Sequence, residues 1–182
     1  MHVHLPNILT FLRLVLAPAL IIFLIIDKTD SAKFLGMFVF IVIIATDFFD
    51  GYLARKYNAV TQIGEILDPI ADKILIVFIL FALSVNLTSY YIAFMSSLII
   101  SREIWVGALR DFNARHNNTK VTKVTFIAKT KTSLQLFTIS IYLLGLALDK
   151  MLLVLFGDMF LFLSLLLTIY SGYIYTIKSF KT

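Results

Sequence analysis

The sequence predicts an all-α fold, an integral membrane bundle of six transmembrane helices with a short N-terminal interfacial segment. Hydrophobic residues fill 60% of the 182 positions, and the mean hydropathy is +0.93, whereas soluble domains average about 45–50% apolar residues. Short polar stretches divide the chain into apolar segments of helical length. Since no other segment is long enough to fold separately, we expect residues 1–182 to form a single membrane domain.

The positions of the polar stretches predict the individual helices. The short amphipathic start, HVHLPNI at residues 2–8, predicts the interfacial segment. The stretches DKTDSAK, KYNAVTQI, NLTS, HNNTKVTKV and LDK then separate the apolar segments. We therefore expect helices at about residues 9–27, 34–56, 63–85, 90–115, 125–147 and 151–178.

The uninterrupted apolar runs are too short to cross a membrane alone. Residues 14–26 and 34–46 each cover about 13 residues, or about 20 Å at 1.5 Å per residue, whereas a span needs about 20 residues. The helices must therefore continue into their charged ends. If the helices alternate up and down, these charged ends lie at the same level of the membrane. Polar groups at that depth are tolerated inside a bundle or at a wet cavity. We expect one polar cavity, open to one side.

Basic residues predict the orientation of the bundle. One end carries Arg55, Lys56, Arg110, Arg115, Lys120, Lys123, Lys129, Lys131, Lys178 and Lys181. The opposite turns carry only Lys28, Lys33 and Lys150, which are balanced by Asp27, Asp30 and Asp149. The positive-inside rule therefore places the cavity and both termini on the cytoplasmic side of the cell membrane.

Charge and cysteine content exclude other classes of function. The net charge of +5 fits this orientation and contact with anionic membrane lipid. No basic stripe with interleaved aromatic residues lies outside the apolar segments, so no nucleic-acid partner is expected. Cysteine is absent, which excludes disulfides, thiolate chemistry and cysteine-ligated zinc.

Four aspartates stand out in the stretch between residues 47 and 72 (DFFDGYLARKYNAVTQIGEILDPIAD). Helical spacing places Asp47, Asp50, Gly51 and Ala54 on one face and Gly64, Asp68 and Asp72 on one face of the next helix. If these helices fold against each other, the carboxylates converge opposite the glycines and Arg55. Such a cluster in or near a membrane is costly unless cations occupy it.

The residue types in this cluster suit magnesium or manganese. Oxygen ligands without histidine or cysteine favour Mg²⁺ or Mn²⁺, and four carboxylates would serve two ions about 3.5–4 Å apart. A two-metal site clamps a phosphate or pyrophosphate, the glycines let a ligand approach the backbone, and Arg55 can bind phosphate oxygens. The alternative is an ion-pair network in which Arg55 pairs with Asp47 or Asp68.

The spacing Asp47-x2-Asp50-Gly51-x2-Ala54-Arg55-x8-Gly64-x3-Asp68-x3-Asp72 resembles the full signature of the CDP-alcohol phosphatidyltransferase family. The resemblance implies a six-helix membrane fold, two divalent metals, and transfer of a phosphatidyl group from CDP-diacylglycerol to an alcohol with release of CMP. It implies metal ligation by Asp47, Asp50, Asp68 and Asp72, with Asp72 also the general base on the acceptor hydroxyl. It implies CDP contacts at Gly51, Arg55, Thr61 and Gly64, and at Asn7 and Thr10 in the similar segment PNILTFLR. Homodimers are common in this family, although no residue here requires one.

A second, basic set of residues predicts the acceptor. We expect the cations Arg102, Arg110, Lys129 and Lys131 at the level of the cavity, where Glu103 would neutralise one of them. Surplus positive charge suits an acceptor that carries its own phosphate, such as glycerol 3-phosphate. The pieces REI-x4-LR and K-x-KT also resemble the phosphatidylglycerophosphate synthase subfamily, except that Ala128 stands where glycine is expected. The alternative is that these cations only orient the protein or bind lipid headgroups.

Two other functions remain open from the sequence. Within the family, the acceptor would instead be phosphatidylglycerol, giving cardiolipin, or an uncharged alcohol such as serine or inositol. From another class, a divalent-cation transporter would also place acids inside a helix bundle. A transporter predicts acids that are accessible from both sides, and it has no use for the glycines or the basic residues.

Overall fold

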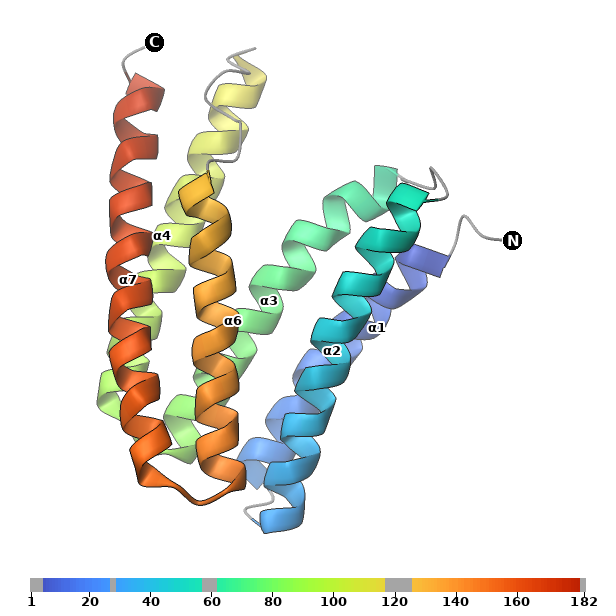
Figure 1. Cartoon of the computed structure of the whole chain (residues 1–182). Helices are drawn as coiled ribbons and strands as arrows, with labels where there is room; N and C mark the ends of the chain where they lie inside the picture. Colours follow the sequence, from blue (N-terminus) through green and yellow to red (C-terminus); the bar gives the residue numbers. More distant parts are fainter. Residues whose placement is uncertain (1–4, 27–28, 57–61, 117–125, 181–182) are drawn as a thin grey trace.

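The computed structural model describes the backbone of residues 5–26, 29–56, 62–116 and 126–180. Within these ranges, the side chains of residues 5–10, 48–56, 62–66, 68–69 and 126–129 lie outside the description. The described residues form helices and turns, with no strand among them, which confirms the all-α prediction. The elements are α1 (Leu5–Ile21), the π-helix η1 (Ile22–Ile26), α2 (Asp30–Lys56), α3 (Gln62–Asn86), α4 (Tyr90–Arg115), α6 (Phe126–Ala147) and α7 (Met151–Phe180) (Figure 1).

Two helices begin earlier than predicted. α2 begins at Asp30 rather than near residue 34, because the Thr29 hydroxyl accepts a hydrogen bond from the Ala32 amide at 3.3 Å. α1 begins at Leu5, so residues 5–8 belong to the first helix, which was predicted to begin near residue 9, and the interfacial position of residues 2–8 stays a prediction. Pro6 is compatible with this start because the amides of a helix's first turn have no helical partner.

The helices form two groups that diverge toward one end of the molecule. α1 packs against α2 and α3, and α7 packs against α4 and α6. Contacts of α3 with α4 and α6, and of α2 with α6, join the groups. Figure 1 shows the groups close together near the α3–α4 and α6–α7 turns and spread apart toward the start of α1 and the end of α7. The larger cavity described below is lined by residues of α3, α4 and α6.

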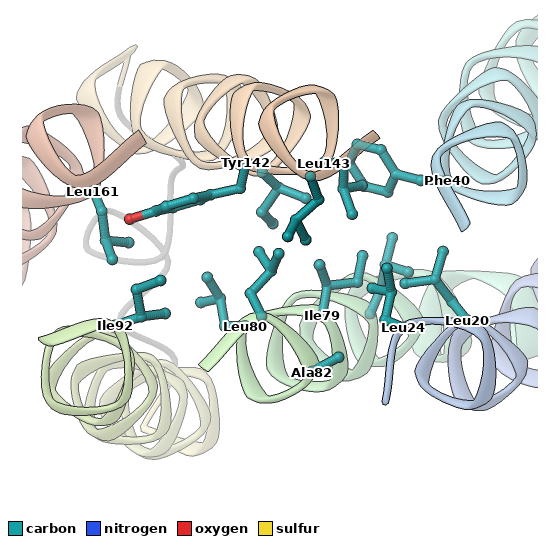
Figure 2. Packing of buried hydrophobic residues seen from close by; sticks show 14 of the residues in the cluster. Leu20, Leu24, Phe40, Ile79, Leu80, Ala82, Ile92, Tyr142, Leu143 and Leu161 are labelled. Carbon is teal, nitrogen blue, oxygen red and sulfur yellow. The ribbon is translucent and has the colours of Figure 1, made fainter. Parts of the chain in front are cut away.

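The hydrophobic core fills the end at which the groups converge. Leu20, Phe40, Ile79, Ile92 and Tyr142, from five different helices, are all buried in one cluster (Figure 2). At the same end, the Ser89 hydroxyl caps α4 by accepting a hydrogen bond from the Ile92 amide at 3.2 Å. This packing fixes the helices at one end and leaves their other ends to form the site.

The outer surface of the bundle is strongly apolar. Exposed phenylalanines occur on each of the described α-helices: Phe11, Phe38, Phe81, Phe94, Phe137 and Phe162. Buried polar side chains, among them Gln135, Thr138 and Ser164, face the interior instead. Among the described residues, α4 and α7 are long and apolar enough to cross a membrane, and residues 11–26 form a shorter apolar helix. This distribution indicates a membrane protein, and six spans remain a prediction.

Candidate active site

An arginine links two of the four aspartates. Asp47 on α2 and Asp72 on α3 both contact Nη1 of Arg13, which comes from α1. The Arg13–Asp72 distance is 2.8 Å. The arginine side chain is buried, 1% exposed, whereas the two carboxylates are 49% and 48% exposed. The two acids therefore lie within hydrogen-bond reach of one nitrogen, as the predicted convergence of the helices requires.

The arrangement of Asp47 and Asp72 fits a hard divalent cation. Their carboxylates come from two helices, face one point, and are close enough for a single positive charge to contact both. Oxygen donors with this spacing are suited to Mg²⁺ or Mn²⁺. No group of three or more acidic, histidine or cysteine side chains gathers within the part of the chain that the structure describes, and the side chains of Asp50 and Asp68 fall outside that part.

A small cavity lies beside this acidic pair. It has a volume of about 50 Å³ and is lined by Arg13, Asp47, Asp72 and Thr132, with Ile43, Ile44, Leu75, Ile76 and Leu136 as its apolar wall. A water needs at least about 10–15 Å³ measured in this way, so the cavity has room for a few waters or an ion. The acidic pair thus borders space for small polar ligands.

A much larger cavity is also bordered by Asp72. It has a volume of about 500 Å³ and is enclosed by α3, α4 and α6. Its charged lining consists of Asp72, Lys73, Arg102, Glu103, Arg110 and Lys131. The volume is within the range of about 300–1,000 Å³ that is usual for small-molecule sites. Because four cations face two carboxylates, this cavity favours an anion.

Glu103 connects two of the cations. Its Oε1 accepts a hydrogen bond from Arg102 Nη1 at 3.0 Å and is also contacted by Lys131 Nζ. Lys131 is buried, and Arg102 and Glu103 are partly buried. A carboxylate between two cations limits their mutual repulsion at close range. The sequence suggested that Glu103 neutralises one cation; the structure places it against two.

Asp72 is the charged residue that the described linings of the two cavities share. Ile76 and Thr132 also line both, but Asp72 carries the only charge that the two described linings share. The structure therefore brings the predicted residues Asp47 and Asp72 together at the smaller cavity. At the larger cavity, Asp72 is joined by Arg102, Arg110 and Lys131. Nine predicted site residues lie outside the described side chains or backbone: Asn7, Thr10, Asp50, Gly51, Arg55, Thr61, Gly64, Asp68 and Lys129.

Sequence reasoning missed Arg13 and Lys73. Arg13 interrupts an apolar run, FLRLVL, and a lone arginine in such a run is itself a signal of a buried partner. Lys73 follows Asp72 directly and reaches across the larger cavity toward α4. Its Nζ lies 3.3 Å from the position that a Cβ on Gly107 would occupy. The absence of a side chain at Gly107 therefore gives Lys73 room beside the cavity.

The chain is similar to proteins of one known family. The model of the CDP-alcohol phosphatidyltransferase family matches residues 3–170. The chain is similar to three proteins named CDP-diacylglycerol–glycerol-3-phosphate 3-phosphatidyltransferase. The Rickettsia bellii protein is 41% identical over 94% of this chain and 93% of its own length. The Rickettsia typhi protein is 40% identical over 98% of both chains, and the Escherichia coli protein is 32% identical over 77% of this chain and 76% of its own.

Proposed function

We propose, because the chain belongs to the CDP-alcohol phosphatidyltransferase family, that it transfers the phosphatidyl group of CDP-diacylglycerol to glycerol 3-phosphate. The products are phosphatidylglycerol phosphate and CMP, so the protein is an enzyme of phospholipid biosynthesis. Relatives that carry this activity in their names match most of the chain. The chain's own residues support the same choice of donor and acceptor.

The observation that carries the proposal is the position of Asp72 between two chemically different cavities. On one side it stands with Asp47, where oxygen ligands suit a divalent cation and a pyrophosphate. On the other side it stands with Arg102, Arg110 and Lys131, where cations suit a phosphate. A residue in this position is within reach of both a donor and a phosphorylated acceptor.

The reaction needs the acceptor hydroxyl beside the donor phosphorus. The phosphate of glycerol 3-phosphate binds the cations of the larger cavity, so that a hydroxyl of the same molecule is held toward Asp72. Asp72 takes the hydroxyl proton as the oxygen attacks the phosphorus next to the diacylglycerol. A new oxygen–phosphorus bond forms, the pyrophosphate bond breaks, and CMP leaves with the electron pair. Because the acceptor is bound in this position, its hydroxyl is already oriented toward the phosphorus and does not have to meet it by diffusion.

The donor is held by the acidic side of the site. Asp47, Asp50, Asp68 and Asp72 would hold two Mg²⁺ or Mn²⁺ ions, which would supply positive charge for the pyrophosphate and the leaving CMP. We assign the CDP contacts to Gly51, Arg55, Thr61 and Gly64, with Asn7 and Thr10 nearby, and a further acceptor contact to Lys129. These assignments follow the family signature and the predicted faces of the helices.

The membrane arrangement belongs to the same proposal. We assign six spans to α1 with η1, α2, α3, α4, α6 and α7 as one domain, because each described α-helix presents exposed aromatic side chains outward. The basic residues place the site and both termini on the cytoplasmic side of the cell membrane. A site at that level lets the acyl chains of CDP-diacylglycerol stay in lipid during the transfer.

An acceptor panel tests the function. Purified protein is incubated with Mn²⁺, CDP-diacylglycerol, and either glycerol 3-phosphate, phosphatidylglycerol, serine or inositol, and CMP release is measured. We expect CMP with glycerol 3-phosphate and only background with the other three. CMP release with another alcohol but none with glycerol 3-phosphate would refute the proposed acceptor while keeping the family chemistry.

A further inference from the structure

The second half of α7 lies along the helix that carries the acceptor arginines. α4 and α7 run side by side (Figure 1), and polar side chains join them over several turns. Trp105 Nε1 donates to Thr176 Oγ1 at 3.0 Å, and Asn113 Nδ2 donates to Ser179 Oγ at 2.9 Å. The two arginines of α4 that line the larger cavity are held by this same face of α7.

Arg102 lies in a cradle formed by Ser171 and Gly172. Its Nη2 donates to Ser171 Oγ at 2.8 Å, while its Nη1 bonds to Glu103. A Cβ on Gly172 would come within 2.8 Å of Arg102 Nε and 3.0 Å of its Cγ. Real Cβ atoms essentially never show contacts below 3.0 Å, so a side chain at position 172 requires a shift, and the Arg102 side chain is the neighbour that it meets. The arginine therefore has this path only because position 172 is glycine.

Arg110 is held by an aromatic face. Its guanidinium carbon lies 5.3 Å from the ring centroid of Tyr175, which is 5% exposed. This is a cation–π distance, and a desolvated ring makes such a contact stronger. The Tyr175 hydroxyl has no hydrogen-bond partner among the described residues, so the ring rather than the hydroxyl makes the contact with Arg110.

We propose that Ser171, Gly172 and Tyr175 are positioning residues for the acceptor: they aim Arg102 and Arg110 at the phosphate of the incoming alcohol. This inference rests on the proposed function and adds a part of the chain outside its sequence motifs. The described lining of the larger cavity includes none of these three residues, so they act on the acceptor through the arginines alone. Changes in α7 should therefore alter the KM for the phosphorylated acceptor and leave the donor unaffected.

Glycine substitutions on one helix separate positioning from packing. Gly172→Ala places a methyl group against Arg102, whereas Gly157→Ala places one 2.7 Å from the buried ring of Tyr142, away from the cavity. We expect Gly172→Ala to raise the KM for glycerol 3-phosphate about tenfold, the effect of losing one well-placed charged contact. The KM for CDP-diacylglycerol should stay unchanged. Gly157→Ala should lower the thermal stability and leave both KM values unchanged.

Two further variants use milder changes. Ser171→Ala removes the hydroxyl bonded to Arg102 without adding an atom, and it should shift the same KM in the same direction by a smaller factor. Tyr175→Leu should raise the KM for glycerol 3-phosphate, whereas Tyr175→Phe keeps the ring and should behave as the unmodified protein. If Tyr175 served only the packing of the helices, Tyr175→Leu and Tyr175→Phe would give the same KM for glycerol 3-phosphate.

The outcomes distinguish this inference from the proposed function. If the unmodified protein releases no CMP with glycerol 3-phosphate, the proposed function fails and the inference fails with it. If the unmodified protein is active but Gly172→Ala and Tyr175→Leu change both KM values equally, or change neither, the function stands and the positioning role is overturned. A change confined to the acceptor KM supports both.

Discussion

The ion pair between Arg13 and the two aspartates leads to a sharp prediction for Arg13→Gln. Glutamine keeps most of the length and the polarity of the side chain but removes its charge. In the variant, Asp47 and Asp72 lose the cation that contacts both of them. Without this cation, the two neighbouring carboxylates repel each other. We therefore expect a lower free energy of unfolding and a changed orientation of the Asp72 side chain.

The size of the effect follows from the burial of the three groups. Hydrogen bonds to charged groups contribute about 1.5–3 kcal/mol net when they are well desolvated. Arg13 is 1% exposed, but the carboxylates are 49% and 48% exposed, so water weakens the pair. We therefore expect the variant to lose about 1–2 kcal/mol of unfolding free energy, which corresponds to roughly 2–8 °C in Tm for a chain of this size. Its kcat should fall about 10–100-fold, the usual effect of losing a group that orients a ligand of the site.

The assay compares thermal unfolding in detergent with EDTA and with saturating Mn²⁺. If a divalent cation binds the same carboxylates, it stabilises whichever protein binds it, by an amount that increases with its affinity. Arg13→Gln has no competing positive charge, so Mn²⁺ should raise its Tm more than that of the unmodified protein. The Tm difference between the two proteins should therefore be smaller in Mn²⁺ than in EDTA.

A surface ion pair provides the matched control. Lys33 bonds to Asp30 at 2.9 Å, three residues away on the first turn of α2. Lys33→Gln removes a cation from an exposed pair, which usually contributes little, and it should change neither Tm nor kcat measurably. Equal responses of Arg13→Gln and the unmodified protein to EDTA and to Mn²⁺, together with an unchanged kcat, would refute the assignment of the two aspartates to one cation site.

Three further predictions test separate parts of the molecule. Asp72→Asn should lower kcat by about 10²–10⁴, the range for loss of a general base, while competition binding finds the affinity for CDP-diacylglycerol largely retained. Arg110→Ala should raise the KM for glycerol 3-phosphate with the donor KM unchanged, and an equal loss for both substrates would contradict the division of the site into donor and acceptor sides. Tyr142→Phe removes a 2.6 Å hydrogen bond to Asp158 and should lower the unfolding free energy by about 1 kcal/mol with both KM values unchanged; a shifted KM would mean that this end of the bundle is coupled to the site.

The helices could be predicted closely because their ends are local features of the sequence. α4 has the predicted bounds, Tyr90–Arg115, since Ser89 caps its start. The start of α2 was misplaced because DKTDSAK is polar, and polarity alone does not distinguish a turn from the capped first turn of a helix. There, Thr29 supplies the cap and Lys33 bonds to Asp30 within the helix. The error was one of local hydrogen bonding rather than of fold.

The partners of the site residues could not be predicted in the same way. The spacing of Asp47 and Asp72 indicated that they converge, but their common partner is 34 and 59 residues away in sequence, on α1. Helical periodicity places a residue on a face and does not say which distant helix that face meets. For the same reason, the sequence predicted that Arg102 lies on α4 but did not indicate its contacts with Ser171 and Gly172.

The network around Glu103 explains how the larger cavity can keep its cations and still bind a phosphate. Arg102 has five N–H donors, and the described contacts engage Nη1 with Glu103 and Nη2 with Ser171. Lys131 has three donors and contacts Glu103 as well. Both cations thus retain donors for an acceptor phosphate while Glu103 limits the repulsion between them. A neutral acceptor would gain little from four cations set against two carboxylates, whereas a phosphate dianion would bring the lining close to charge balance. The charge of the larger cavity therefore supports the proposed acceptor, an alcohol that carries its own phosphate.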